Sequence, residues 1–129
     1  ATNSNLHLVE PLGFDISEKA VRRSGLDYWK HVSLITHPSY EEFRKSVPKS
    51  AGLWWFSKFA TRGLYEANFQ DGDYLIFGKE TTGLAESIHK SEPSDHFLAI
   101  PMFSEKIRSL NLANAASIAL YEAIRQVSE

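Results

Sequence analysis

Hydrophobic residues occur along the chain in short runs that alternate with more polar stretches. Five runs, at residues 6–10, 31–36, 53–57, 74–78 and 97–102, have the length and composition of β-strands. The third and fourth are almost continuously apolar, as in Leu53-Trp54-Trp55-Phe56. Continuous apolar runs are typical of strands buried on both faces of a sheet. The pattern therefore predicts an α/β fold with a mostly parallel sheet flanked by helices.

Helices are expected between these strands. Asp15 or Ser17 can cap a helix that ends at Gly25, and Ser39 followed by Glu42 has the spacing of a capping box. A weaker helical pattern covers residues 84–90. The strongest covers residues 112–126, which contain five alanines and neither glycine nor proline. Its middle turns have little polar surface, which indicates either a core helix or a helix packed on a second subunit.

Composition narrows the class of protein. The 129 residues suit a single domain, 1–129, and 43% of them are hydrophobic. The absence of cysteine excludes disulfides, thiolate metal sites and a cysteine nucleophile. The five histidines lack the spacing of metal ligands, and no apolar run is long enough to span a membrane. We therefore expect no metal and no membrane partner.

The segment after the fourth run is a candidate binding loop. Gly78 and Gly83 bound a short stretch that follows a buried strand and precedes a helix. Ligands of open α/β sheets bind beyond the carboxyl ends of the strands. Leu84-Ala85 stands where a phosphate-binding loop needs Lys-Ser or Lys-Thr, so an uncharged adenosine-like group suits this loop better than a triphosphate. A tight structural turn explains the same glycines equally well.

A second polar segment follows the last strand. Pro101 cannot donate to a sheet, so the strand should end there. Ser109, Asn111 and Asn114 then surround the start of the long helix, where each is also an ordinary capping residue. Capping explains each of these residues singly. It does not explain why two polar loops, each at the end of a strand, both lie next to the strongest predicted helix.

Local basic clusters stand out against a net charge of -2. Arg22 and Arg23 lie near the end of the first expected helix, and Arg108 precedes the last one. Such clusters can hold an RNA phosphate backbone. Solvated surface charge explains any one of these residues as well.

Four blocks of sequence carry a resemblance to a known family. They are residues 6–14 and 22–29, then Phe69-Gln70-Asp71-Gly72-Asp73-Tyr74 through Glu80-Thr81-Thr82-Gly83-Leu84, and last Ile100-Pro101-Met102 with Arg108-Ser109-Leu110-Asn111-Leu112-Ala113-Asn114-Ala115. In this order they resemble the SPOUT RNA methyltransferases. Within that class the chain is similar to the tRNA (cytidine/uridine-2'-O-)-methyltransferases that modify the anticodon wobble nucleotide, C or U. The last two blocks are the specific ones.

The resemblance implies a fold and a set of partners. It implies an α/β domain with a deep trefoil knot at its C-terminus, a cytoplasmic homodimer, and an S-adenosylmethionine pocket in the knot, with S-adenosylhomocysteine as the product. The substrate it implies is the ribose 2'-OH of a tRNA, which makes the chain an RNA-binding methyltransferase. The Ala-rich helix then has a reason, because small side chains let backbones approach closely in the knot and the dimer.

The resemblance also assigns roles to residues. By position, the cofactor site is expected at Phe56, Gly78, Ile100, Ser109 and Leu110. Candidates for a catalytic role are Glu80 and Asn111, in the same loops. Arg22, Arg23 and Arg108 are the candidates for contact with tRNA phosphates.

The sequence departs from the family at two places. Family members begin with a further strand and a helix that carries an N-T-G-N-x-x-R-type segment, whereas this chain starts at Ala1-Thr2-Asn3. We therefore expect the first strand and that arginine to be missing, which leaves a binding-only protein without turnover as the alternative to an enzyme. The second departure is Phe56-Ser57-Lys58-Phe59-Ala60-Thr61, where relatives often have a Thr-Lys-Gly turn.

Overall fold

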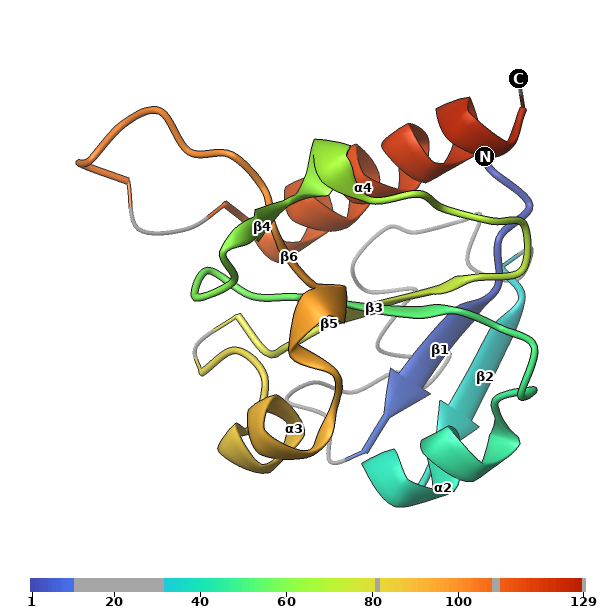
Figure 1. Ribbon diagram of the computed structural model, residues 1–129. Helices are drawn as coiled ribbons and strands as arrows, with labels where there is room; N and C mark the ends of the chain where they lie inside the picture. Colours follow the sequence, from blue (N-terminus) through green and yellow to red (C-terminus); the bar gives the residue numbers. More distant parts are fainter. Residues whose placement is uncertain (11–31, 81, 108–109, 129) are drawn as a thin grey trace, which may run out of the picture. The chain divides into compact units, whose positions relative to one another are not determined.

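The computed structural model (Figure 1) describes residues 1–10, 32–80, 82–107 and 110–128. The chain forms two compact units, residues 1–49 and residues 50–129, and strands pair in parallel in two separate sheets. The α/β fold class with parallel strands is therefore confirmed. The single domain and the knot stay predictions, and the helix expected to begin at Asp15 or Ser17 lies outside the described residues.

The first unit contains a parallel strand pair and one helix. Strand β1 (Leu6–Val9) pairs with β2 (Leu34–His37), with Leu6 opposite Leu34 and Val9 opposite His37. Helix α2 (Tyr40–Ser46) follows directly. Its N-cap is Ser39, whose side-chain oxygen accepts a hydrogen bond from the Glu42 backbone N–H at 3.1 Å. The cap predicted from the Ser39 and Glu42 spacing is confirmed, because this oxygen satisfies a backbone donor that the helix cannot.

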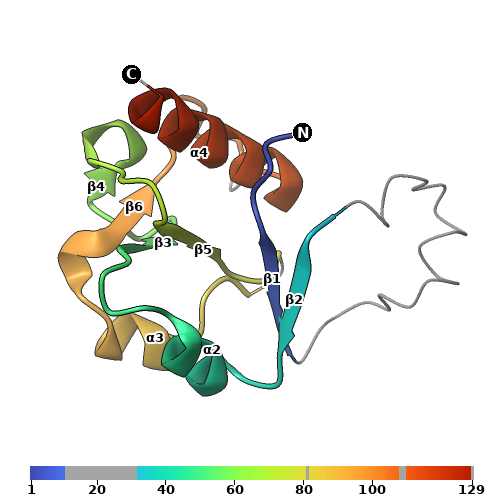
Figure 2. The ribbon, with the colours of Figure 1, turned by 90° about the vertical axis from the view of Figure 1, so that its right-hand side faces the viewer.

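The second unit contains a four-stranded sheet in the order β4-β6-β3-β5. All neighbouring strands are parallel, and β3 lies between β5 and β6. Figures 1 and 2 show helix α4 on one side of this sheet and α3 on the other. The elements are β3 (Leu53–Phe56), β4 (Arg62–Gly63), the 3-10 turn η2 (Leu64–Glu66), β5 (Tyr74–Phe77), α3 (Glu86–Ser91), η3 (Ser94–His96), β6 (Phe97–Ala99) and α4 (Leu112–Val127).

All five predicted strands are present in the chain, and three of them, with both helices of this unit, lie close to their expected bounds. The last strand ends at Ala99 instead of reaching residue 102, in keeping with the Pro101 that follows. The short strand β4 was not predicted, because its two residues, Arg62 and Gly63, carry no hydrophobic pattern. Strand β2 begins at Leu34, three residues after the expected start.

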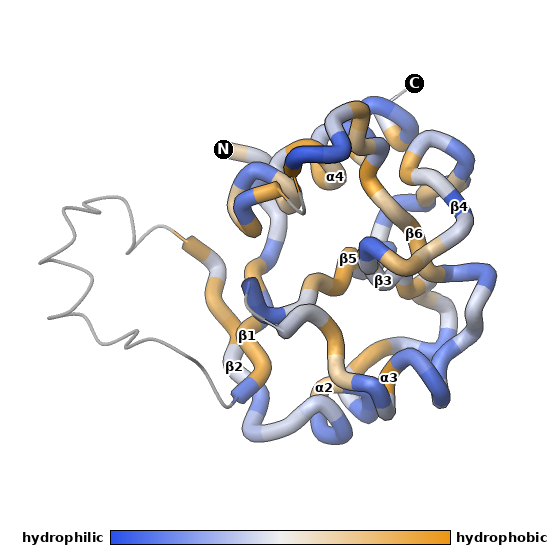
Figure 3. Tube along the Cα trace, turned by 90° about the vertical axis from the view of Figure 1, so that its left-hand side faces the viewer, coloured by the Kyte–Doolittle hydropathy of each residue, from blue (hydrophilic) through white to orange (hydrophobic). Residues whose placement is uncertain are grey.

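Strand β3 is buried along its whole length. Its four residues are between 1% and 9% exposed, and β5 and β6 are mainly hydrophobic in Figure 3. Trp54 and Phe56 belong to the main core cluster, which also contains Leu64, Ala67, Phe69, Leu98 and Ala119. Trp55 stacks on Phe97 at 5.5 Å between ring centroids. Burial on both faces explains the continuous apolar run.

One carboxylate joins the starts of β3 and β5. Asp73 precedes β5, and its Oδ1 accepts a hydrogen bond from the Gly52 N–H at 3.0 Å. Its Oδ2 accepts from Trp54 Nε1 at 3.0 Å and from the Gln70 N–H at 2.9 Å. A Cβ on Gly52 would come within 2.6 Å of Oδ1, so any larger residue there would require the Asp73 side chain to move from this position.

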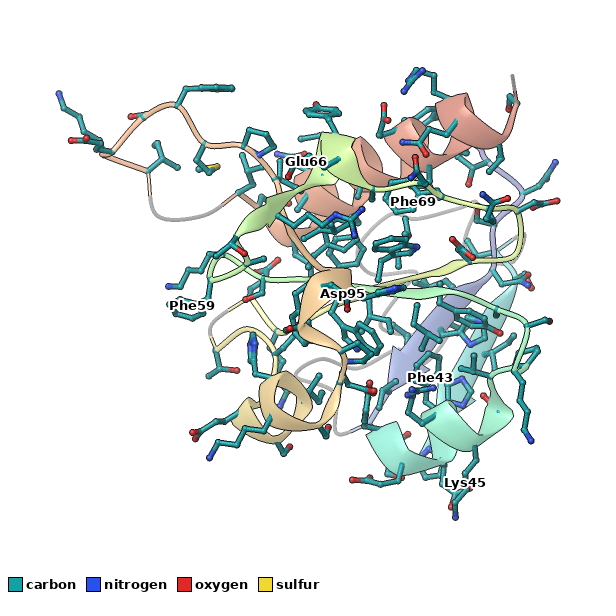
Figure 4. The ribbon with its side chains drawn as sticks, viewed as in Figure 1. Phe43, Lys45, Phe59, Glu66, Phe69 and Asp95 are labelled. Atoms are coloured by element: carbon teal, nitrogen blue, oxygen red, sulfur yellow. The ribbon has the colours of Figure 1, made fainter. Side chains whose placement is uncertain are left out.

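Helix α4 is fixed to the segment before β5 by Gln126. Its side-chain oxygen accepts from the Phe69 N–H at 2.8 Å, and its Nε2 donates to the Ala67 carbonyl at 3.0 Å (Phe69 is labelled in Figure 4). Nε2 also donates to Glu122. Hydrogen bonds from Arg125 and then Gln126 lower the pKa of Glu122 to about 2. The helix end is thus held by paired backbone and side-chain groups.

Replacement of Gln126 by alanine should destabilise the protein. Gln126→Ala leaves the Phe69 N–H and the Ala67 carbonyl without these partners, so the free energy of unfolding should fall by about 1–3 kcal/mol. Urea denaturation measures this change. The control Lys90→Ala, in an exposed ion pair on α3, should change stability by less than about 0.5 kcal/mol. Equal stability of the two variants would show that Gln126 contributes no more to the free energy of unfolding than the exposed Lys90 does.

Candidate cofactor site at one edge of the parallel sheet

The carboxyl ends of β3, β5 and β6 meet at one edge of the sheet, since the three strands are parallel. Figure 1 shows the loops that follow them leaving the sheet at this edge. Phe56 ends β3, Gly78 follows β5, and Ile100 follows β6. Phe56 lies opposite both Phe77 and Leu98 in the strand register. The structure therefore brings three of the five sequence-predicted cofactor residues to one place.

The loop after β5 closes on itself. Lys79 and Gly83 form an antiparallel bridge, in which the Gly83 N–H donates to the Lys79 carbonyl at 2.8 Å and the Lys79 N–H donates to the Gly83 carbonyl at 3.3 Å. Gly83 has a φ of +69°, which favours glycine. The tight structural turn considered in the sequence analysis is therefore present. A binding loop and a tight turn are compatible here.

Gly78 permits a close approach of two backbone segments. A Cβ at this position would lie 2.1 Å from the carbonyl carbon of Gly83 and 2.2 Å from the nitrogen of Leu84. Such distances require the loop to shift, because the obstacle is backbone. The close approach of backbone is therefore the reason that this position requires glycine.

The walls of this edge are aromatic and aliphatic. The rings of Phe56 and Phe77 stack at 4.7 Å with an angle of 11° between their planes. Ile100 packs against the core cluster and remains partly exposed. Glu80 is an exposed carboxylate in the closed loop, next to Lys79. Apolar walls suit an uncharged ring system as the ligand, and Glu80 places a carboxylate of the protein near it.

Asn111 has a clear local role. It is the N-cap of α4, and its side-chain oxygen accepts hydrogen bonds from the backbone N–H groups of Ala113 at 2.9 Å and Asn114 at 3.3 Å. Leu110 precedes it and is half-buried. Asn114 is thus inside the helix and does not cap it. The catalytic role of Asn111 stays a prediction.

Several predicted site residues lie outside the described residues. They are Ser109 of the cofactor set and all three arginines predicted to bind RNA: Arg22, Arg23 and Arg108. In the part of the chain that the structure describes, no three histidine or carboxylate side chains are grouped so that they could hold a metal ion. In the same residues no helix has the length and hydropathy needed to cross a membrane.

Two basic residues after β3 have different surroundings. Arg62 donates to the carbonyls of Asp95 at 2.9 Å and Glu66 at 3.1 Å, and its guanidinium lies 5.5 Å from the Trp54 ring centroid. It therefore supports the structure. The Lys58 ammonium lies 5.2 Å from the centroid of the exposed Phe59 ring.

The first unit contains a histidine pair that sequence spacing gave no reason to expect. His7 Nδ1 lies 2.9 Å from His37 Nε2, and the rings are within 7° of parallel. His37 is buried, and Phe43 of α2 meets both rings edge-on. Burial, and then repulsion by His37, lowers the pKa of His7. One proton fits between the two nitrogens, so the hydrogen bond requires at least one neutral ring.

Residues 1–121 of the chain match the SpoU rRNA Methylase family. The chain belongs to this family. The resemblance recognised in the sequence blocks is thereby confirmed. Phe56, Gly78 and Ile100 lie at the carboxyl ends of parallel strands, which is where ligands of open α/β sheets bind.

Two curated members of the SpoU family align over nearly the whole chain. A protein of Lactococcus lactis named putative tRNA (cytidine(34)-2'-O)-methyltransferase is 42% identical over 98% of this chain and 76% of its own length. A protein of Saccharophagus degradans named tRNA (cytidine(34)-2'-O)-methyltransferase is 44% identical over 98% of this chain and 80% of its own length. The relatives thus share the specific wobble-position name.

Two solved structures of SpoU-type proteins have the same fold. One, studied for the 2-OH methylation of C/U34 on tRNA, is 47% identical, covers 95% of this chain and 78% of its own, and has a TM-score of 0.84. The other is the SpoU methyltransferase AviRb from Streptomyces viridochromogenes in complex with the cofactor AdoMet. It is 26% identical, with a TM-score of 0.74, and the match covers 95% of this chain and 49% of its own.

The histidine pair predicts a loss of stability in mild acid. His7 has a folded-state pKa below its ordinary value of 6.5, so the unfolded chain binds the proton more readily. The contribution of neutral His7 to the free energy of unfolding is fully present above pH 6.5 and decreases as the pH falls below that value. Urea unfolding at pH 7.5 and 5.5 should show a smaller decrease for His7→Asn than for the unaltered protein.

The titration of His7 itself gives a direct check of its lowered pKa. In a histidine NMR titration of the folded protein, the His7 resonance should change at lower pH than that of a histidine in an unfolded peptide. Equal titration of His7 in both states would contradict the assigned shift. His7→Asn serves here to assign the resonance.

Proposed function

We propose that this chain is a methyltransferase that uses S-adenosylmethionine to methylate the ribose 2'-OH of nucleotide 34, C or U, in the anticodon of a tRNA. The observation that carries the proposal is the 42–44% identity, across 98% of the chain, to relatives named for this position. The solved structure studied for C/U34 supports both bases. The AdoMet complex of AviRb supports the methyl donor.

The residues at the sheet edge fit this methyl donor. When bound, S-adenosylmethionine supplies a methyl group on a positively charged sulfur. An adenine ring needs apolar walls, which we assign to Phe56 and Ile100, and backbone partners, which we assign to the loop that packs closely against Gly78. None of these residues is charged. Ser109 and Leu110 complete the proposed set from the loop before α4.

The chain contributes chiefly by positioning. Methyl transfer to a hydroxyl is an in-line displacement in which a carbon–oxygen bond forms while the carbon–sulfur bond breaks and the hydroxyl loses its proton. Holding the two reactants in line supplies most of the acceleration. We assign Glu80 as the catalytic candidate for receiving this proton, because it is a carboxylate in the loop that Gly78 closes. Asn111 would orient the loop before α4 through its cap hydrogen bonds.

The proposed partners are a tRNA and a second copy of this chain. Arg22, Arg23 and Arg108 would contact tRNA phosphates, since a net charge of -2 leaves local clusters to attract a polyanion. For the dimer, the outward side of α4 carries Ile118 and Tyr121, which are 37% and 56% exposed. Ala119, by contrast, is fully buried in the core of its own unit. We place the reaction in the cytoplasm, where tRNA is processed.

The function is tested by a methylation assay on unmodified tRNA, with the modified nucleotide located by mass spectrometry of nuclease fragments. A single added methyl group at the ribose of nucleotide 34 is the expected product. Binding of S-adenosylhomocysteine without turnover would instead support the binding-only alternative. Methylation at another nucleotide would overturn the assignment of the wobble position.

Gly78 should be required for cofactor binding. Gly78→Ala places a Cβ against the Gly83 backbone and displaces the loop, so the affinity for S-adenosylhomocysteine should fall by at least about tenfold, or 1.4 kcal/mol. Isothermal titration calorimetry measures the affinity. Gly63→Ala is the matched control, because a Cβ there has only an ordinary contact at 3.4 Å. Unchanged affinity in folded Gly78→Ala would place the cofactor elsewhere.

The dimer should depend on the outward side of α4. Tyr121→Glu adds a charge at a 56% exposed position, so it should shift the protein toward monomer without disturbing the core. Light scattering coupled to gel filtration measures the mass. Lys90→Glu, an exposed change on α3, is the control and should leave the mass unchanged. A dimer that persists in Tyr121→Glu would show that another surface forms the interface.

A further inference from the structure

A small hollow opens beside the loop that follows β3. It has a volume of about 220 Å³ and is lined by Phe59, Ala60, Thr61, His89, Ser94 and Phe97. These residues come from three places: the loop after β3, helix α3, and the junction of η3 with β6. All of them belong to the second unit. The hollow is therefore built by segments whose mutual positions the sheet determines.

Three of the residues that line this hollow carry aromatic rings: Phe59, His89 and Phe97. His89 stacks on the buried Phe97 with 5.1 Å between centroids, and Phe59 approaches His89 edge-on at 6.3 Å. Phe59 itself is 76% exposed and points away from the body of the unit in Figure 4. A single exposed aromatic is ordinary on a protein surface. An exposed ring next to a hollow that already contains stacked rings is a more specific arrangement.

The charge and size of the hollow restrict its ligand. Pockets for drug-sized ligands measure about 300–1,000 Å³, so this smaller hollow suits one planar ring. The hydroxyls of Thr61 and Ser94 and the His89 imidazole supply hydrogen-bonding groups around it. The Lys58 ammonium lies over the ring of Phe59, 5.2 Å from its centroid, and so adds a positive charge next to one of the lining residues. A flat ring with polar edges and an attached phosphate matches these features.

We propose that one unpaired base of the RNA substrate stacks on Phe59 over this hollow, with Lys58 near its phosphate. The inference rests on the proposed function, because it names where that RNA is held. Unpaired bases commonly stack on aromatic side chains, whereas bases in a duplex are not available. Phe59 follows β3 at its carboxyl end, the same edge of the sheet that holds Gly78.

Binding of a labelled anticodon stem–loop RNA, followed by fluorescence anisotropy, tests the proposal. Phe59→Ala should weaken binding about tenfold or more, as expected for the loss of one base stack, and Phe59→Trp should retain it. Tyr65→Ala is the matched control, since Tyr65 is an equally ordinary exposed aromatic at 62% exposure on the same unit. The affinity for S-adenosylhomocysteine should stay unchanged in all three variants. A parallel loss of that affinity in Phe59→Ala would overturn the stacking site.

Abasic RNAs identify the partner base. With one loop nucleotide at a time made abasic, a single position should bind the unaltered protein and Phe59→Ala with nearly the same affinity. Additive losses at every position would contradict stacking.

The methylation assay separates the stacking site at Phe59 from the proposed function. If the unaltered protein methylates nucleotide 34 while Phe59→Ala binds RNA normally, the stacking site is wrong and the proposed function stands. If Phe59-dependent binding occurs without methylation, the function is wrong and the site stands. If the unaltered protein binds no RNA, both are wrong.

Discussion

The second unit depends on the burial of β3. Its four residues, Leu53–Phe56, are shielded on both faces and paired on both edges, by β5 and by β6. Because all three strands are parallel, this central position fixes where each of them ends. The loops after them then have to share one edge of the sheet. Phe56, Gly78 and Ile100 meet there as a consequence of strand direction and register, before any requirement of the cofactor is considered.

The same constraint explains why so much of this unit could be predicted. Continuous apolar runs mark β3 and β5, and alanine content with an asparagine cap marks α4, so the physical causes of these elements are local in sequence. Strand β4 could not be predicted, because its two residues carry no hydrophobic pattern and are a strand only through their pairing with β6. The Gln126 contacts to Ala67 and Phe69 join positions 59 and 57 residues apart, and no pattern of residue spacing predicts them.

The sequence indicated that three of the candidate site residues follow or end strands, but not the contacts that they make. A Cβ at Gly78 would meet atoms of Gly83 and Leu84. That contact depends on how the loop closes, which the glycine spacing alone leaves open. Ala119 shows a similar limit. The alanine-rich helix suggested a core or a subunit interface, and the two are separated only when the structure turns Ala119 inward and leaves Tyr121 56% exposed.

The loops at the sheet edge therefore differ in how tightly they are constrained, and this bears on what each can do. The loop after β5 is closed by backbone hydrogen bonds and a glycine contact, so it has little freedom to change without losing its shape. The loop after β3 leads to Arg62 of β4, whose side chain donates hydrogen bonds to two backbone carbonyls. Within this loop, Phe59 projects outward, so its side chain can vary without disturbing the core. A rigid loop suits a ligand whose chemistry is fixed, such as a methyl donor. A loop with an exposed, replaceable side chain suits the part of an RNA that differs from one substrate to another. We therefore expect family members to differ more often at the position of Phe59 than at the position of Gly78.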